Sequence, residues 1–233
     1  MASEATARAA TSASARLRRK LDLAVSPFAS ASAALMEHPR IAELWPRYLV
    51  ATHTIIRTTV PLMETAVARA RELGQDEVAA GAAEYFERHI EEERDHDLWL
   101  LDDLELIGVA REEVHRRVPS ATVARLVGAQ YYWVLHYHPV ALLGYFGVME
   151  GFPPQPELVE ELIERTRYPR ESFRTFAEHG ELDPHHREEL DEAIDGLPLT
   201  PEQEAAIGVS AIATCDLLAQ SVREVIEELP ASS

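Results

Sequence analysis

The stretch from His179 to His186 carries two imidazoles and a carboxylate at spacings that suit a helix. On a helix that turns by about 100° per residue, Asp183 lies about 40° from His179, and His186 lies about 20° away on the other side. All three side chains then share one face. Imidazole and carboxylate together suit iron, manganese, zinc or nickel, and two histidines with one acid form the ligand set of open non-haem iron sites. The stretch therefore indicates a metal site.

Two other interpretations of this stretch stay open from its own residues. It could be an ordinary polar helix face, or Asp183 could cap a new helix whose first residue is Pro184, in which case it binds no metal. If one helix instead runs through the stretch, Pro184 cannot donate a hydrogen bond to the Gly180 carbonyl. Such a helix is expected to be distorted or mobile until metal binds.

A second candidate is the pair Glu93-x-x-His96, which lies in a predicted helix over residues 77–107. The spacing of three residues directs both side chains toward one metal, as in carboxylate di-iron bundles. Glu92 is an alternative to Glu93 as the acid. His89 lies seven residues before His96 on the same face, and is a candidate to orient a ligand or to face the substrate. The alternative to a site is a solvated, charged helix face.

Two further acids stand alone in apolar surroundings. Glu150 follows the uncharged run 140–149, and a buried carboxylate is costly unless it is paired, protonated or bound to metal. Glu64 is a similar lone acid. Arg57, seven residues before Glu64, could bind a substrate carboxylate or form an ion pair with Glu64. His136, fourteen residues before Glu150, could line a substrate pocket.

These candidates must be positioned by helices, because no stretch of useful length alternates with period two. We expect a single all-α bundle of about seven helices over residues 13–233, after a disordered tail at 1–12. Helices are predicted over 13–24, 40–73, 77–107, from Ser120 to about Glu150, and over 157–167 and 170–195. Pro61 should kink or split the second of these near Thr59, and Pro139 should bend the fourth. Thr200-Pro-Glu-Gln203 predicts a capping box that opens the last helix.

Composition limits the class of protein. The 233 residues are 46% hydrophobic and carry a formal net charge of −18, which argues against a nucleic-acid partner. No run of 18 apolar residues occurs, so no membrane span is expected. The N-terminus lacks a signal-peptide core, and the single cysteine, Cys215, fits a reducing cytoplasm.

In order and type, the candidate pieces resemble the haem-oxygenase-like di-iron oxidases and oxygenases. The matching pieces, over roughly residues 38–220, are Pro61-Leu-Met-Glu64, the run from His89 to Gly108, the run from His138 to Gly151, and His179-x3-Asp183-x2-His186. The resemblance implies a bundle that binds no haem but holds two Fe(II) ions, with manganese as an alternative metal, and uses O2 as co-substrate. The implied ligands are Glu64, Glu93, His96, Glu150, His179, Asp183 and His186.

The resemblance also implies a small organic substrate, with an amino acid or amine favoured. The reaction would be N-oxygenation, desaturation or oxidative C–C cleavage in specialised metabolism. An external electron donor and a homodimer are both compatible with it. One rival is a metal-independent enzyme of the same fold, of the thiaminase or cofactor-biosynthesis type, and the thiaminase type would need a nucleophilic cysteine. Cys215 reads instead as a core residue. A second rival is a helical metal- or ligand-binding protein without catalytic activity.

Overall fold

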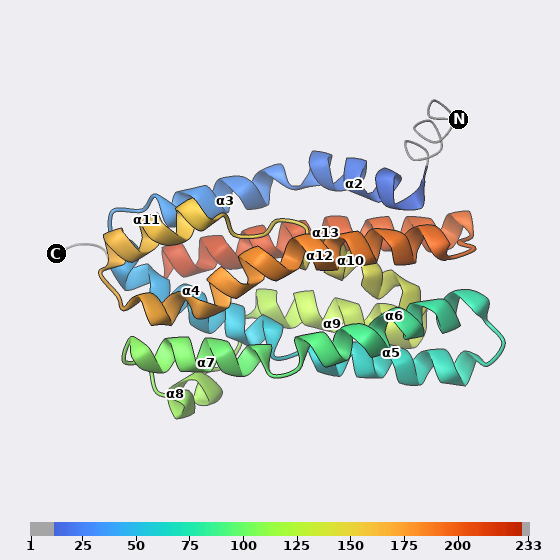
Figure 1. Ribbon diagram of the computed structural model, residues 1–233, viewed down its shortest axis with the longest axis horizontal. Helices are drawn as coiled ribbons and strands as arrows, with labels where there is room; N and C mark the ends of the chain where they lie inside the picture. Colours follow the sequence, from blue (N-terminus) through green and yellow to red (C-terminus); the bar gives the residue numbers. More distant parts are fainter. Residues whose placement is uncertain (1–11, 230–233) are drawn as a thin grey trace.

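The computed structural model describes residues 12–229, in which all the regular secondary structure is helical (Figure 1). In chain order the helices are α2 (Ala13–Ala24), α3 (Ser26–Met36), α4 (Ile41–Ile56), α5 (Thr59–Leu73), α6 (Glu77–Glu93), α7 (His96–Leu106), α8 (Arg111–Arg116), α9 (Ala121–His136), η1 (Pro139–Ala141), α10 (Leu142–Met149), α11 (Pro156–Thr166), η2 (Arg170–Phe173), α12 (Arg174–Gly196) and α13 (Pro201–Glu227). The all-α prediction is confirmed.

The described part of the chain holds more helical segments than the seven or so that were expected. The predicted helices over 40–73, over 77–107 and from Ser120 to about Glu150 are each divided into shorter ones. The 40–73 helix splits before Thr59, as Pro61 predicted. The helix expected to end near Glu150 breaks at Tyr137, just before Pro139. The predicted tail at 1–12 lies outside the described residues except for Ser12, whose hydroxyl caps α2.

The longest helix, α13, lies along the bundle and packs against α2, α3, α4, α9 and α10 (Figure 1). It opens with the predicted capping box, in which Thr200 and Gln203 bond to each other's backbone N–H groups. By length and composition alone α13 could cross a membrane, but 61% of its most apolar window is buried inside the bundle. Such burial is also what the core helix of a bundle shows.

Close approach of α10 to α13 fixes the position of Glu150. A Cβ atom added to Gly144 would lie 2.2 Å from the Ile207 carbonyl oxygen, so only glycine allows the two backbones to come this close. Gly147 faces side chains of α2 and α12 in ordinary contact. Both glycines therefore serve helix packing.

Two clusters of buried apolar side chains form the core. One gathers residues of α5, α6, α9, α10 and α13, including Tyr85, Phe86 and Phe146; the other gathers residues of α4, α7 and α11, including Trp45 and Leu49. Each fully buried large apolar side chain contributes about 1.5–3 kcal/mol. These two clusters supply the free energy needed to hold a group of buried polar side chains where α6, α7, α10 and α12 meet.

Candidate metal centre

Helix α12 runs without interruption through Pro184, from Arg174 to Gly196. Asp183 is 3% exposed in the middle of this helix, so the interpretation of Asp183 as a helix cap is wrong. Because Pro184 has no N–H group, the Gly180 carbonyl lacks its partner within the helix. Gly180 also approaches Pro154 so closely that an added Cβ would lie 2.7 Å from the Pro154 carbonyl oxygen.

The prediction of one unbroken helix over 77–107 is wrong, because α6 ends at Glu93 and α7 begins at His96. Between them the backbone of Arg94 is extended and Asp95 adopts a left-handed conformation with φ of 68°. Aspartate is one of the few residues other than glycine that enter this region readily. Despite the break, His96 Nδ1 lies 3.3 Å from Glu93 Oε2, so the two predicted ligands do come together.

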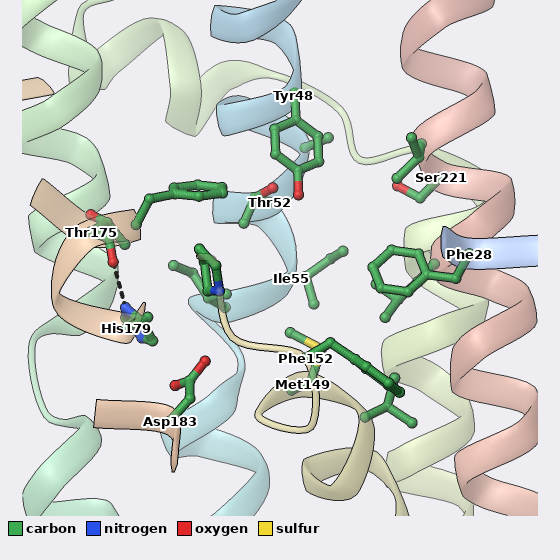
Figure 2. Close-up of a pocket in the computed structure, with 17 residues that line it drawn as sticks. Phe28, Tyr48, Thr52, Ile55, Met149, Phe152, Thr175, His179, Asp183 and Ser221 are labelled. Atoms are coloured by element: carbon green, nitrogen blue, oxygen red, sulfur yellow. Dashed lines mark hydrogen bonds between the residues drawn. The ribbon is translucent and has the colours of Figure 1, made fainter. Parts of the chain in front are cut away.

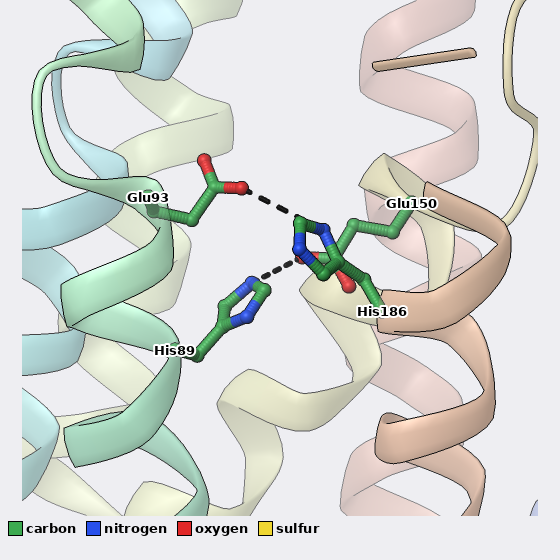
Figure 3. A group of neighbouring side chains, drawn as sticks. All are labelled: His89, Glu93, Glu150 and His186. Atoms are coloured by element: carbon green, nitrogen blue, oxygen red, sulfur yellow. Dashed lines mark hydrogen bonds and ion pairs between the residues drawn. The ribbon is translucent and has the colours of Figure 1, made fainter. Parts of the chain in front are cut away.

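A first set of donor atoms, here called the His89 group, joins α6, the end of α10 and α12 (Figure 3). Its members are His89, Glu93, Glu150 and His186. Their donor atoms all lie within 4.8 Å of one another. His89 Nε2 donates a hydrogen bond to Glu150 Oε1 over 2.6 Å, and His186 Nδ1 lies 3.8 Å from Glu93 Oε1.

A second set, the His96 group, consists of Glu93, His96 and His179, again with donor atoms within 4.8 Å of one another. Glu93 therefore belongs to both groups. His179 Nδ1 donates to the Thr175 carbonyl oxygen over 2.8 Å, which leaves Nε2 without a proton and able to bind a metal. A hydrogen bond on the second ring nitrogen is the usual way in which a protein orients a histidine ligand.

Several polar atoms at this meeting of helices are buried without a hydrogen bond. They are Glu150 Oε2, His96 Nδ1, His186 Nδ1 and Asp183 Oδ1. Each such atom costs about 1–3 kcal/mol when nothing compensates it. Four of them around one shared carboxylate fit a pair of metal ions bound through carboxylates and imidazoles. The residues present therefore suit the iron that the family resemblance implies.

Burial and neighbouring acids set the charge states of the side chains at this meeting of helices. Burial alone would lower the pKa of His89, but its hydrogen bond to Glu150 and the charges of Glu150 and Glu93 outweigh it and raise the pKa to about 9. Burial raises the pKa of Asp183, and the charges of Glu150 and Glu93 raise it further, to about 8. Without metal, both groups are therefore largely protonated at pH 7.

In three other side chains of the two groups the pKa is lowered. Burial opposes ionisation of Glu93, but His96 and the other nearby histidines lower its pKa to about 2. Burial lowers the pKa of His179, and burial together with the charge of His89 lowers that of His186 to about 4. Two neutral imidazoles and one ionised carboxylate are thus ready to bind a cation.

Of the other candidates, Glu92 lies beside the site and Arg57 lines a cavity next to it. Glu92 Oε2 accepts a hydrogen bond from His89 Nδ1 over 3.2 Å, so it orients His89, while Glu93 holds the position shared by both groups. Glu64 is exposed on α5 and belongs to neither group. His136 is exposed at the end of α9, because the break at Tyr137 separates α9 from the segment that carries Glu150.

An apolar cavity of about 180 Å³ reaches the centre (Figure 2). Its apolar lining includes Phe28, Tyr48, Ile55, Phe152, Phe176 and Leu218. His179 and Asp183 lie at one end, and Phe28 and Ser221 lie at the other. A second, charged cavity of about 250 Å³ is lined by Arg57 and by all three members of the His96 group. Ile56 and His179 line both cavities, so both cavities adjoin the His96 group.

Solved structures show what fold this is. The chain superposes on a domain of unknown function with a heme oxygenase-like fold from Shewanella denitrificans, with a TM-score of 0.72 and 18% identity, covering 93% of this chain and 89% of that one. A CADD-like protein of unknown function from Nostoc punctiforme gives 0.66 and 21% identity, over 93% and 96%. A TenA homolog from Pseudomonas syringae gives 0.63 and 13%, over 89% and 93%. The fold is therefore haem-oxygenase-like.

Residues 46–219 match the model of a family described as iron-containing redox enzymes. The match covers most of the chain, and the protein belongs to this family. No curated protein gives a significant match. The family assignment agrees with the buried cluster of histidines and acids, which offers the donor atoms that iron requires.

His89 is the member whose role the sequence underestimated, because it was expected only to orient a ligand or to face the substrate. Its spacing of four residues from Glu93 was the available signal, since residues four apart on one helix share a face. Trp99 was missed altogether. Its ring lies 3.9 Å from that of His96 and under the guanidinium of Arg174. The sequence gives no sign that this tryptophan will lie against His96.

Proposed function

We propose that this protein is a non-haem di-iron oxidase or oxygenase that uses O2 to oxidise a small organic substrate. The observation that carries the proposal is the position of Glu93, which belongs to two donor groups at once. A carboxylate shared between two sets of ligands is the arrangement by which bundles hold two metal ions side by side. Membership of a family of iron-containing redox enzymes supports iron rather than zinc or nickel.

In this proposal Glu93, His96 and His179 would hold one ion. His89, Glu150 and His186 would hold the other, with Glu93 between the two. Bound ferrous ions would supply the electrons and the open coordination positions that O2 chemistry requires.

The residues around the ions have their own tasks. Glu92 orients His89, and the Thr175 carbonyl orients His179. Asp183 lies between the centre and the apolar cavity, and its raised pKa lets it hold a proton at Oδ1 or Oδ2 beside the substrate. The apolar lining of the cavity excludes water from the reacting end of the substrate.

The substrate is expected to be small, with an amino acid or amine favoured, and the reaction to be N-oxygenation, desaturation or oxidative C–C cleavage in specialised metabolism. When one oxygen atom of O2 enters the substrate and the other becomes water, two further electrons are needed, so an external donor is part of the proposal. A cytoplasmic location, a homodimeric assembly, and the lack of nucleic-acid or membrane partners are also proposed.

The test is to reconstitute the protein with ferrous iron without oxygen, count the bound iron, and then follow O2 consumption across a panel of amino acids, amines and fatty acids. We expect about two irons per chain and consumption that one substrate class accelerates. Manganese loading in parallel tests the choice of metal. Less than one iron per chain, together with O2 consumption no faster than that of free ferrous iron, would overturn the proposal.

A metal-independent enzyme of the same fold is less well supported. Cys215, which a thiaminase-type reaction would need as its nucleophile, is 1% exposed within the apolar core. Burial raises the pKa of this thiol to about 11, so it is not ionised at neutral pH. It lines neither the apolar nor the charged cavity.

A further inference from the structure

Helix α12 begins without a cap of its own. Its N-cap residue is Phe173, whose side chain cannot accept a hydrogen bond. The first N–H groups of a helix have no partner within the helix and need an acceptor from elsewhere. Here the acceptor comes from α7, because the Thr175 backbone N–H donates to Asp103 Oδ2 over 2.9 Å. Asp103 is 1% exposed, so α7 caps α12 from inside the bundle.

A second contact joins the same two helices one turn away. Trp99 lies four residues before Asp103, on the same face of α7. The Arg174 guanidinium carbon lies 4.5 Å from the centroid of the Trp99 ring, a distance at which a cation is attracted to an aromatic face. Arg174 and Thr175 are neighbours in the first turn of α12. Helix α7 therefore holds the start of α12 through two side chains.

The first turn of α12 in turn orients a candidate metal ligand. The Thr175 carbonyl oxygen accepts the hydrogen bond from His179 Nδ1 over 2.8 Å (Figure 2). The residue whose N–H group binds Asp103 is thus the residue whose carbonyl orients His179. His96 is the first residue of α7, and the Trp99 ring lies against its ring. Helix α7 supplies one ligand of the His96 group and the support for another.

This support matters because α12 is weakened further along. Pro184 leaves the Gly180 carbonyl without its partner in the helix, so fewer hydrogen bonds join the first half of α12 to the second. A helix end whose N–H groups lack acceptors opens readily. Without the oxygen of Asp103, the first turn would open, and the Thr175 carbonyl would no longer hold His179 in place.

We infer that Asp103 is a positioning residue for the candidate metal centre. It fixes the first turn of α12, so that the Thr175 carbonyl keeps the imidazole proton of His179 on Nδ1 and Nε2 faces the metal. Asp103 belongs to neither donor group and lines neither the apolar nor the charged cavity, so it acts through Thr175. The inference rests on the proposed function for the metal, but it also predicts a property of the metal-free protein.

In the metal-free protein, the 15N chemical shifts of the histidine rings show which nitrogen carries the proton. The signals of His179 are identified by their absence from His179→Gln. We expect the proton on Nδ1 in the parent protein, and exchange of the proton between Nδ1 and Nε2 in Asp103→Ala. Asp103→Asn keeps a carbonyl oxygen as acceptor and should restore the parent pattern.

Two further variants separate positioning from stability. Leu104→Ala, in the buried core next to Asp103, destabilises the protein without removing an acceptor, and should keep the parent pattern. Asp103→Ser has a hydroxyl too short to reach the Thr175 N–H group, and should behave like Asp103→Ala. It is the test variant if Asp103→Ala does not fold.

Cobalt(II) binding, measured by competition with a chelating dye, tests the same role with metal present. Asp103→Ala should weaken binding of one of the two ions by about tenfold to a hundredfold and leave the other unchanged, as expected when the support behind a histidine ligand is lost. In His179→Ala protein the same substitution should have no further effect, because the side chain that Asp103 positions is gone.

The possible failures are distinct. If Asp103→Ala and Asp103→Ser kept the proton on Nδ1 and the parent affinity for both ions, the inference would be overturned. An equal loss of affinity with and without His179 would also overturn it, because Asp103 would then act on stability alone. A parent protein that binds no cobalt would overturn the proposed function instead, and the position of the imidazole proton would still decide the role of Asp103.

Discussion

The two donor groups differ in what surrounds them. In the His89 group, the three members that are not shared are at most 5% exposed and line neither cavity. In the His96 group, His179 lines both cavities, and Glu93 and His96 line the charged one. A metal position enclosed by protein retains its ion, whereas one that adjoins cavities can bind a substrate. If the proposed function holds, the His89 group would retain its ion, and the His96 group would be the position that meets the substrate.

The largest expected effect comes from the residue that the groups share. Glu93→Gln removes the carboxylate from both, so bound iron should fall from about two per chain to below one, with loss of O2 consumption. Elemental analysis after reconstitution measures this. Glu91→Gln, two residues away and exposed, is the control and should keep its iron. Two irons in Glu93→Gln would show that the groups do not depend on one carboxylate.

Removing a ligand from one group alone should separate the two roles. His179→Ala leaves the His96 group with two donors, so about one iron per chain should be lost while the other stays. O2 consumption should disappear with it. His186→Ala leaves three donors in the His89 group, so iron there should bind more weakly without being lost completely. Elemental analysis at several iron concentrations distinguishes these results, and identical losses in both variants would contradict the difference between the groups.

The groups should also respond differently to pH. Metal must displace a proton from His89, whose pKa is about 9, whereas burial lowers the pKa of His179 and keeps it neutral. Affinity should therefore rise with pH between 6 and 8 by about tenfold per unit for each displaced proton. The slope should be steeper for the His89 group, measured in His179→Ala, than for the His96 group, measured in His186→Ala. Competition with a chelating dye gives both slopes, and equal slopes would refute the assignment.

His53 shows how a buried histidine behaves without acids around it. It is 0% exposed, and neither ring nitrogen has a hydrogen bond. Burial, together with the charge of Arg57, lowers its pKa to about 4. Since the unfolded chain binds this proton near pH 6.5, stability is complete above that pH and falls as the pH drops toward 4.

The smallest predicted effect follows from that shift. Between pH 7 and pH 5 the parent protein should lose about 2 kcal/mol of unfolding free energy through His53. The His53→Phe variant should lose about 2 kcal/mol less unfolding free energy than the parent protein between these two pH values. Urea unfolding of both metal-free proteins at the two pH values measures the difference. If the two proteins lost stability in parallel, His53 would not be the group responsible.

The sequence could predict those parts of the fold and the site that depend on local signals. Pro61 and Pro139 marked helix breaks, and Thr200 marked a helix start, because each acts through its own backbone. The left-handed conformation of Asp95 could not be predicted, since it depends on how α6 and α7 pack. The positions of His89, Glu150 and His186 in one group likewise depend on three helices meeting.

Glu64 shows the limit of reasoning from a lone acid. Its neighbours Leu62 and Met63 are buried, yet Glu64 itself is exposed. An acid among apolar residues on a helix can point either way, because only the packing of α5 decides which face meets solvent. The same reasoning succeeded for Glu150, which is buried at the end of α10 because Gly144 lets that helix approach α13.

The contact between Gly180 and Pro154 has a mechanical consequence. Pro154 lines the apolar cavity, and Gly180 lies on α12 between the turns that carry His179 and Asp183. Any side chain at position 180 would meet the Pro154 carbonyl, so only glycine allows this approach. A molecule that pushes the cavity wall outward would therefore press on the helix at the point where Pro184 has removed a hydrogen bond. The wall of the apolar cavity and the turn of α12 that carries His179 and Asp183 therefore adjoin each other directly.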